Sequence, residues 1–420
     1  RRGVMALPRV TESAANRYLP LPPDERDGVA LCLSGGGSRA ALFELGAIRR
    51  LDEVGVLAAV DTVSSVSGGS ILAAHLATRL QPWPTDSPAF SIFDEVASSF
   101  EAFTKKNLRT APLAKRLLVP WNWFDDTTAI DELTELFAKH LSSLSLSDLP
   151  ARPAFVFNAS DNTFGVNWEM SRKQVGSSEA GWATTPDWSV ARAVAASSCF
   201  PPIYDPMPID LDPDQLRKGD YEGEDRDELV RGIRLSDGGL IDNLAMEPVW
   251  RTHRAIISID GGGTFDPKPD QGWPMRVKSY VDIMGRQVAF GRKRWLISNL
   301  AHGVLEGAYL GIGSAVASYD EGLPGYAAPT VKRYISEIRT DLDRFSDAEA
   351  RILQNHGYLL ADAAVKTHLS TTSLADHIQE APLQIPYPDE MDEALVKREL
   401  ATSADTKKLG RGSWWRFLRD

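Results

Sequence analysis

Short apolar runs alternate with amphipathic stretches near the start of the chain, and this alternation predicts the core of the fold. The apolar run Val29–Leu33 ends in glycines, which is typical of a buried parallel strand. Residues 38–55 repeat apolar side chains three and four positions apart, as in a helix packed on a sheet. A second short strand at 61–66 and a second helix at 68–80 follow. This order predicts an α/β fold with a mainly parallel central sheet.

Beyond residue 80 the pattern changes. Residues 81–150 combine a Pro-rich loop with two helical stretches, and we expect a helical insertion that caps a site. Residues 153–160 and 165–171 alternate as in an antiparallel strand pair. Residues 208–230 form a charged segment without periodicity, and the chain after residue 275 is largely helical. The sequence therefore predicts a core with insertions and a helical C-terminal region.

Composition narrows the classes of function. The chain has 420 residues and is 43% hydrophobic, enough for one large α/β domain with elaborations or for two domains. Its formal net charge of -11 disfavours nucleic acid as a partner. The two cysteines, Cys32 and Cys199, lie in apolar surroundings, which favours core thiols and a cytoplasmic location.

Neither a membrane-spanning nor a secretory segment is predicted within the sequence. No run approaches the ~18 apolar residues of a membrane span. The chain begins with Arg1 rather than Met and lacks the apolar core of a secretory signal, so we expect it to begin inside a longer protein.

The first motif that carries chemistry is the segment 34–39, Ser-Gly-Gly-Gly-Ser-Arg, between a strand and a helix. Its glycines let the backbone approach a ligand, and the helix start offers unpaired N–H groups. Such a site suits either the oxyanion of acyl transfer or a phosphate. Because Gly35-x-Gly37-x-x-Ala40 also fits the dinucleotide fingerprint, both interpretations stay open here, beside a plain tight turn.

The second motif is Ser65-Val66-Ser67-Gly68-Gly69, between the second strand and the second helix. It matches the nucleophile-elbow pattern G-x-S-x-G with serine at the first position. The small residues at 65 and 69 allow the sharp turn, and Ser67 is the candidate nucleophile at the helix N-terminus. The alternative is that Ser67 only caps the helix.

The third motif, Asp237-Gly238-Gly239, follows the apparent strand GIRLS. We expect Asp237 at the carboxyl end of a parallel strand, where α/β active sites lie. The alternative is a turn aspartate, since Asp-Gly is a common turn dipeptide.

Together, in this order, the three motifs resemble those of the patatin-like phospholipases. That family has a G-G-G-x-R/K segment, a G-x-S-x-G elbow and a distant D-G-G or D-G-A. Two further segments are similar to family segments: Phe157-Asn158-Ala159-Ser160, and Ala195-Ala196-Ser197-Ser198 with Phe200-Pro201-Pro202. The resemblance covers roughly residues 28–265. It implies a three-layer α/β sandwich.

The resemblance also implies site roles, whereas the domain organisation is predicted from the pattern along the whole chain. Ser67 would be the nucleophile of a lipid acyl hydrolase, Asp237 its base in a dyad, and Gly35, Gly36 and Gly37 the oxyanion hole. Arg39 and Gly68 would contact substrate, with Arg39 binding a lipid phosphate or stabilising the glycine segment; a solvated Arg39 is the alternative. The expected organisation is an N-terminal arm (1–27), a catalytic domain (28–330) with the insertion 81–150 and the excursion 208–230, and a helical extension packed on it (331–420).

Neither a histidine triad nor a metal site is favoured. The order Ser, Asp, His would permit His253 or His302, but nothing in the sequence marks either. No Cys/His cluster has zinc spacing. Residues 210–214 resemble the start of a calcium-binding loop. The rest of the pattern is absent, because Gln215 and Tyr221 occupy the positions that require Gly and Glu. We expect no cofactor and no metal.

A lipid substrate implies peripheral contact with a membrane surface. The aromatic and basic candidates for this contact are Trp121, Trp123 and Phe124 in the insertion, and Trp414, Trp415 and Phe417 beside Arg411, Arg416 and Arg419 in the tail. Packing on the core is the alternative for both groups.

Two competing functions remain. The first is a nucleotide-binding α/β enzyme, which needs an acid at the end of the second strand, whereas Asp61 precedes that strand. The second is a catalytically silent scaffold of the same fold, against which the presence of both Ser67 and Asp237 argues.

Overall fold

The computed structural model describes residues 20–85, 90–106, 108, 128–201, 204–263, 275–401 and 403. Within these residues the chain forms a ten-stranded sheet whose main path runs β10-β9-β1-β2-β3-β4-β5-β6. The strands are β1 (Val29–Leu33), β2 (Thr62–Val66), β3 (Ala154–Asp161), β4 (Val166–Ser171), β5 (Gln174–Ser177), β6 (Gly181–Thr184), β7 (Met207–Pro208), β8 (Arg234–Asp237), β9 (Ala255–Asp260) and β10 (Glu306–Gly311). The helices are α2 (Gly37–Glu53), α3 (Gly68–Arg79), α4 (Phe90–Thr104), α6 (Thr128–His140), α7 (Val190–Ser198), α8 (Arg226–Arg231), α9 (Gly239–Asp242), α10 (Met275–Ala301), α11 (Ala328–Thr330), α12 (Asp347–Thr367) and α13 (Glu393–Leu400).

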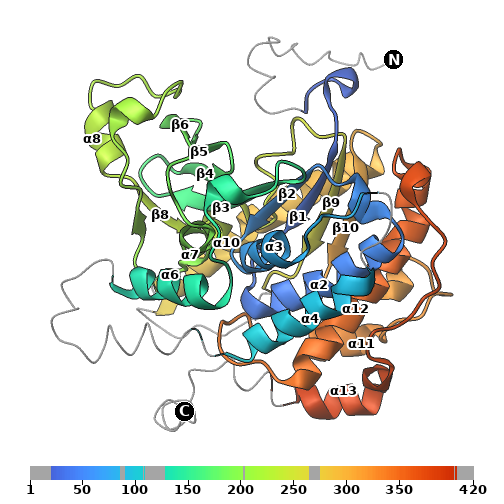
Figure 1. Ribbon diagram of the computed structural model, residues 1–420. Helices are drawn as coiled ribbons and strands as arrows, with labels where there is room; N and C mark the ends of the chain where they lie inside the picture. Colours follow the sequence, from blue (N-terminus) through green and yellow to red (C-terminus); the bar gives the residue numbers. More distant parts are fainter. Residues whose placement is uncertain are drawn as a thin grey trace, which may run out of the picture.

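The expected α/β sandwich with a mainly parallel centre is confirmed. Strands β10, β9, β1, β2 and β3 are parallel to their neighbours, and β4 to β6 continue the sheet as an antiparallel meander. Helices α2, α4 and α12 are stacked beside one another on one face (Figure 1). The expected antiparallel pair is β3 with β4.

Alternate side chains of the central strands enter two separate cores. Leu31 and Leu33 belong to the large cluster beneath α2, α3 and α12. Ala30 and Cys32 point the other way, into a smaller cluster that Leu296 of α10 closes. Because successive strand residues point to opposite faces, the continuous apolar run of β1 is explained by a sheet covered on both sides.

The strand that ends in Asp237 differs from the expectation. We expected a parallel strand, but β8 runs antiparallel to β3, with Ala159 opposite Asp237. Strand β3 extends three residues beyond the end of β2, where Val66 pairs with Asn158. Over this stretch β4 pairs with the other edge of β3, so β8 pairs with the same edge of β3 as β2 does. The strands β2 and β8 run in opposite directions, and their C-terminal ends face each other. The ends of β2 and β8 therefore meet.

Helix α12 of the C-terminal region packs closely against α2. A Cβ atom at Gly46 would lie 1.9 Å from the backbone oxygen of Gln354, and one at Gly357 would lie 1.9 Å from the backbone oxygen of Phe43. Only glycine allows two helix backbones to approach so closely. The residues after 330 are thus packed on the core of the fold.

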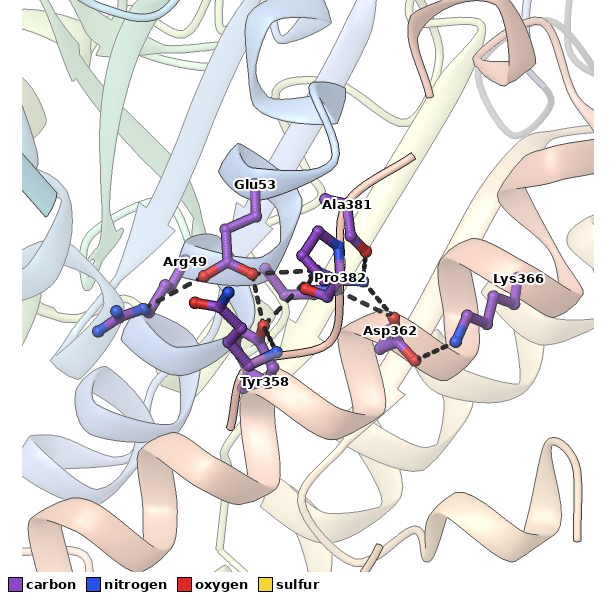
Figure 2. A network of polar contacts seen from close by, with 9 residues as sticks. Arg49, Glu53, Tyr358, Asp362, Lys366, Ala381 and Pro382 are labelled. Atoms are coloured by element: carbon purple, nitrogen blue, oxygen red, sulfur yellow. Dashed lines mark hydrogen bonds and ion pairs between the residues drawn. The ribbon is translucent and has the colours of Figure 1, made fainter. Parts of the chain in front are cut away.

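A buried polar network fixes the register of these two helices (Figure 2). Arg50 of α2 donates to Asp362 of α12 at 2.8 Å and to Glu53 at 3.0 Å. It also donates to the backbone oxygens of Ala381 and Pro382, and Lys366 pairs with the second oxygen of Asp362. Buried ion pairs add little net stability, but they disfavour every register that leaves a charge unpaired.

The close contact of the two helices generates a stability prediction. Gly46→Ala places a methyl group inside the backbone of α12, and we expect a loss of about 1–3 kcal/mol in the free energy of unfolding. Gly291→Ala on α10 is the matched control, since nothing lies within 4 Å of its added Cβ, and it should be neutral or slightly stabilising. Thermal unfolding followed by circular dichroism measures both; equal melting temperatures for Gly46→Ala and wild type contradict the packing.

Candidate active site

Ser67 lies in the sharp turn between β2 and α3, with φ 50° and ψ −118°. A positive φ is uncommon for a residue with a side chain and stores strain that the surroundings must hold. The next two glycines make the turn possible, because a Cβ at Gly68 would lie 2.3 Å from the oxygen of Gly37 and one at Gly69 would lie 2.4 Å from the oxygen of Leu33. Ser65 is buried and donates to the oxygen of Val156.

The side chains of Ser67 and Asp237 are in direct contact. The Ser67 hydroxyl donates to Oδ2 of Asp237 at 2.7 Å. The other carboxylate oxygen accepts the Gly239 N–H at 2.8 Å. This arrangement follows from β2 and β8 ending against each other, and it leaves the carboxylate oriented by two donors.

The C-terminal end of α7 holds both strand ends in place. The Ser67 N–H donates to Oγ of Ser197 at 3.0 Å, and the Ser197 hydroxyl in turn donates to the oxygen of Asn158 at 2.6 Å. The Asp237 N–H donates to the oxygen of Cys199 at 3.2 Å. No local pattern marks Ser197 in the sequence; its only signal is that residues 195–202 resemble a segment of the patatin-like phospholipases.

The glycine segment lies beside Ser67, with φ 147° at Gly36 and 59° at Gly37. The Gly35 N–H donates to the oxygen of Asn243 at 3.1 Å, so this amide is already occupied, which departs from the expectation for Gly35. The amides of Gly36 and Gly37 make no hydrogen bond to another described residue. Two backbone donors at the start of α2 therefore remain available to a ligand.

Arg39 does not face the pocket, which corrects the expectation that it binds a lipid phosphate. Its side chain is fully buried. The guanidinium donates to four backbone oxygens, those of Gly261, Gly262, Ser336 and Ile338. Burial lowers the pKa of Arg39 to about 10. Arg39 therefore ties the glycine segment to two loops far away in the sequence.

Glu44 supports the same segment from the other side. It is fully buried and accepts the Ser34 N–H at 2.7 Å, and the Gly261 N–H donates to the Ser34 hydroxyl at 2.8 Å. Burial raises the pKa of Glu44 well above its usual range. Sequence reasoning missed Glu44 because an acid within a helix is ordinarily solvated.

A pocket of about 300 Å³ opens over Ser67 and Asp237. Its lining also includes glycines 35–37, Asn243, Phe200, Tyr204 and residues 340–342. Phe200 is 53% exposed at this site. Gly68 does not line the pocket, contrary to the expectation of a substrate contact; it packs against Gly37 instead.

The surroundings of Asp237 make its carboxylate more basic than that of an exposed aspartate. Burial raises the pKa of Asp237 to about 6, while the hydrogen bonds from Ser67 and Gly239 act in the opposite direction. The carboxylate is therefore ionised at neutral pH, yet it is more basic than an exposed aspartate. No arginine, lysine or histidine is among the described residues that line the pocket.

A family model for patatin-like phospholipases matches residues 31–250, just over half of the chain. The chain belongs to the patatin-like phospholipase family. No curated protein matches the chain.

Solved structures give weaker likenesses. Human GIVD cytosolic phospholipase A2 in complex with methyl gamma-linolenyl fluorophosphonate is 13% identical with a TM-score of 0.43, covering 95% of this chain and 62% of that one. VipD from Legionella pneumophila is 16% identical with a TM-score of 0.33, covering 94% of this chain and 79% of that one. The chain spans less than two thirds of the human phospholipase structures that it matches. The family assignment rests on the family model alone.

The patatin-like match ends before two segments that complete the pocket. Gly261 and Gly262 hold Arg39 after β9, and Asp341 accepts the Ser38 N–H at 3.0 Å. Both segments lie beyond residue 250, where the family model stops. The glycine segment of this patatin-like protein is thus held by its C-terminal third.

The two candidate triad histidines lie elsewhere. His253 bonds to Oγ1 of Thr62, at the opposite end of β2 from Ser67. His302 is exposed and contacts the oxygen of Ser298.

Among the residues that the structure describes, no three His, Cys, Asp or Glu side chains lie together so that they could hold a metal ion. No helix among them is long and apolar enough to cross a membrane.

The aromatic residues expected at a membrane surface, at 121–124 and 411–419, lie outside the described residues, as does Pro202.

The raised pKa of Asp237 generates a second stability prediction. Because the folded state holds this proton up to about pH 6, whereas an unfolded aspartate titrates near pH 4, its contribution to stability falls as pH rises between these values. Asp237→Asn removes the buried charge and should raise the free energy of unfolding at pH 7.5 by about 1–3 kcal/mol, with the gain vanishing near pH 4. Exposed Asp214→Asn is the control in thermal melts, and a lower melting temperature of Asp237→Asn at pH 7.5 contradicts the argument.

Proposed function

We propose that this patatin-like protein is a serine acyl hydrolase that cleaves fatty-acyl esters of lipids through a Ser67–Asp237 dyad. The 2.7 Å contact between the Ser67 hydroxyl and the Asp237 carboxylate is the observation that carries this proposal. A hydroxyl at a strained turn, beside a basic carboxylate and unpaired backbone amides, has the parts that acyl transfer needs.

In the proposed first step, Asp237 accepts the Ser67 proton as Oγ attacks the ester carbonyl carbon. The carbonyl oxygen becomes an oxyanion, and its collapse breaks the ester bond as Asp237 returns the proton to the leaving alcohol. An acyl-enzyme remains on Ser67. Asp237 then takes a proton from water as the water oxygen attacks the acyl carbonyl carbon. The bond between this carbon and Ser67 Oγ breaks, Asp237 returns the proton to Oγ, and the fatty acid is released.

We assign the oxyanion hole to the amides of Gly36 and Gly37. Both lie at the start of α2, where the helix dipole adds partial positive charge. Backbone donors of this kind stabilise the transition state more than the ground state, because they point at charge that develops during the reaction. The role of Gly35 in this proposal is to anchor the segment through Asn243.

We propose a lipid at a membrane surface as substrate, with peripheral contact and no nucleic acid partner. A mixed lining of backbone amides and apolar side chains suits a glycerolipid ester with its acyl chain. Both cysteines are free and buried, which supports a cytoplasmic location.

The nucleotide-binding alternative has less support. A phosphate cradle needs the Gly35 amide, which is occupied by Asn243. Asp61 accepts the Val29 N–H and pairs with Arg152 at the opposite end of the sheet. The silent scaffold is also less favoured, since a scaffold does not require a buried ionisable carboxylate against a strained serine.

The decisive experiment is fatty-acid release from mixed phospholipid vesicles. Ser67→Ala and Asp237→Asn should each lose more than ~10³-fold in activity, because each removes one partner of the dyad. Exposed Ser143→Ala and Asp214→Asn are matched controls that should retain full activity. Undiminished release by folded Ser67→Ala contradicts the proposal.

The pH dependence follows from the raised pKa of Asp237. The carboxylate acts as a base only when ionised, so kcat/KM should fall about tenfold per unit below pH 6 and level off above it. A soluble p-nitrophenyl ester avoids effects of pH on lipid ionisation. A profile that stays flat from pH 5 to pH 8, with stable protein throughout, would show that another group acts as base.

A further inference from the structure

The two halves of α10 have different surroundings. In the C-terminal half, Leu296 is fully buried and packs with Trp295 and Leu300 on the smaller core. In the N-terminal half, large apolar side chains are exposed to solvent instead: Tyr280 60%, Val281 53%, Ile283 44%, Met284 61% and Val288 42%. An exposed apolar group of this density marks an interaction surface.

Helical spacing gathers these side chains on one broad side of the helix. Tyr280, Met284 and Val288 are four residues apart, so they lie one above the other along α10. Val281 borders this row, and Ile283 widens it on the other flank. We call these five residues the α10 apolar face.

The charge of α10 is opposite to that of the whole chain. In sequence the helix carries six cations and one carboxylate, Asp282, on a protein with a formal net charge of -11. The cations are Arg276, Lys278, Arg286, Arg292, Lys293 and Arg294. The guanidinium groups of Arg286 and Arg294 lie 4.7 Å and 5.8 Å from the ring centroid of Phe290. Cations beside apolar and aromatic side chains complement an anionic lipid surface.

One turn beyond the apolar face, helix α10 contacts helix α9, which follows Asp237. Helix α9 begins at Gly239, two residues after Asp237, and Gly239 lines the pocket. Arg292 of α10 donates to the oxygen of Ile241 in α9 at 3.1 Å and pairs with Glu247 at 2.6 Å. Leu240, adjacent to Gly239, is itself 38% exposed. A surface bound by α10 would therefore lie close to the pocket.

We propose that the α10 apolar face docks on an anionic lipid bilayer and brings the pocket to its substrate. This inference rests on the proposed function and names the surface through which that function reaches a membrane. The apolar side chains enter the interfacial region, and cations of the exposed part of α10, Arg286 and Arg294, contact the lipid head groups. Charge complementarity admits an anionic bilayer, and the connection of α10 to the pocket through α9 favours it over a second copy of the acidic chain.

Binding is tested first on the full chain carrying Ser67→Ala, so that no lipid is consumed. Co-sedimentation is measured with vesicles of phosphatidylcholine alone and with added phosphatidylglycerol. Met284→Gln/Val288→Gln should weaken binding at least tenfold, because it removes two apolar contacts without changing charge. Arg286→Gln/Arg294→Gln should lose the preference for phosphatidylglycerol. Ser279→Gln, exposed on the same helix outside the apolar face, is the matched control and should bind as the parent does.

The same variants with Ser67 intact separate docking from catalysis. Hydrolysis of a soluble short-chain ester should be unchanged in Met284→Gln/Val288→Gln, whereas release from vesicles should fall at least tenfold. Absence of soluble-ester hydrolysis in the wild type counts against the proposed function, while the binding assay still tests docking.

Two results overturn the docking proposal. One is vesicle binding that is absent in the parent or equal in parent and variant. The other is a parent that sediments as a dimer and becomes a monomer in Met284→Gln/Val288→Gln, which assigns the face to a second copy of the chain.

Discussion

Strands β2 and β8 end against each other along one edge of β3, and the site depends on this constraint. Because β3 extends beyond β2, β8 can occupy the vacant length of the same edge and run in the opposite direction. The result is a serine from one strand end and an aspartate from another, 170 residues apart in sequence, at hydrogen-bond distance. Helix α7 adds backbone and hydroxyl contacts to both ends and so fixes their separation.

The glycine segment, residues 34–39, depends on a second set of constraints. Its glycines adopt backbone angles that a side chain disfavours, and its helix is held by Arg39 and Glu44, both fully buried. Arg39 reaches backbone oxygens after β9 and in the segment 336–338, which places the C-terminal third in direct contact with the site. The packing of α12 on α2 secures that third against the sheet (Figure 2).

Local patterns predicted the first strands of the sheet and the first two helices. They also marked Ser67 in an elbow and Asp237 before two glycines as candidates, but only the resemblance to the patatin-like phospholipases implied that the two act together. The direction of β8 was wrong, since a four-residue strand carries no periodicity that reports its orientation. The expected contact of Arg39 with substrate was wrong for a different reason, whereas its alternative role in stabilising the glycine segment agrees with its contacts. Its partners lie more than 200 residues away, and no local signal distinguishes a buried arginine that binds carbonyl oxygens from one that faces a ligand. The role of Asn243 was missed on the same ground.

Activation of Ser67 by Asp237 can be tested by the rate and position of covalent labelling with an alkyl fluorophosphonate, followed by mass spectrometry of proteolytic peptides. We expect a single phosphonylated residue, Ser67, with a labelling rate that rises as pH passes about 6 and that falls by ~10² or more in Asp237→Asn. Labelling of another serine, or an equal rate at Ser67 in Asp237→Asn, would contradict it.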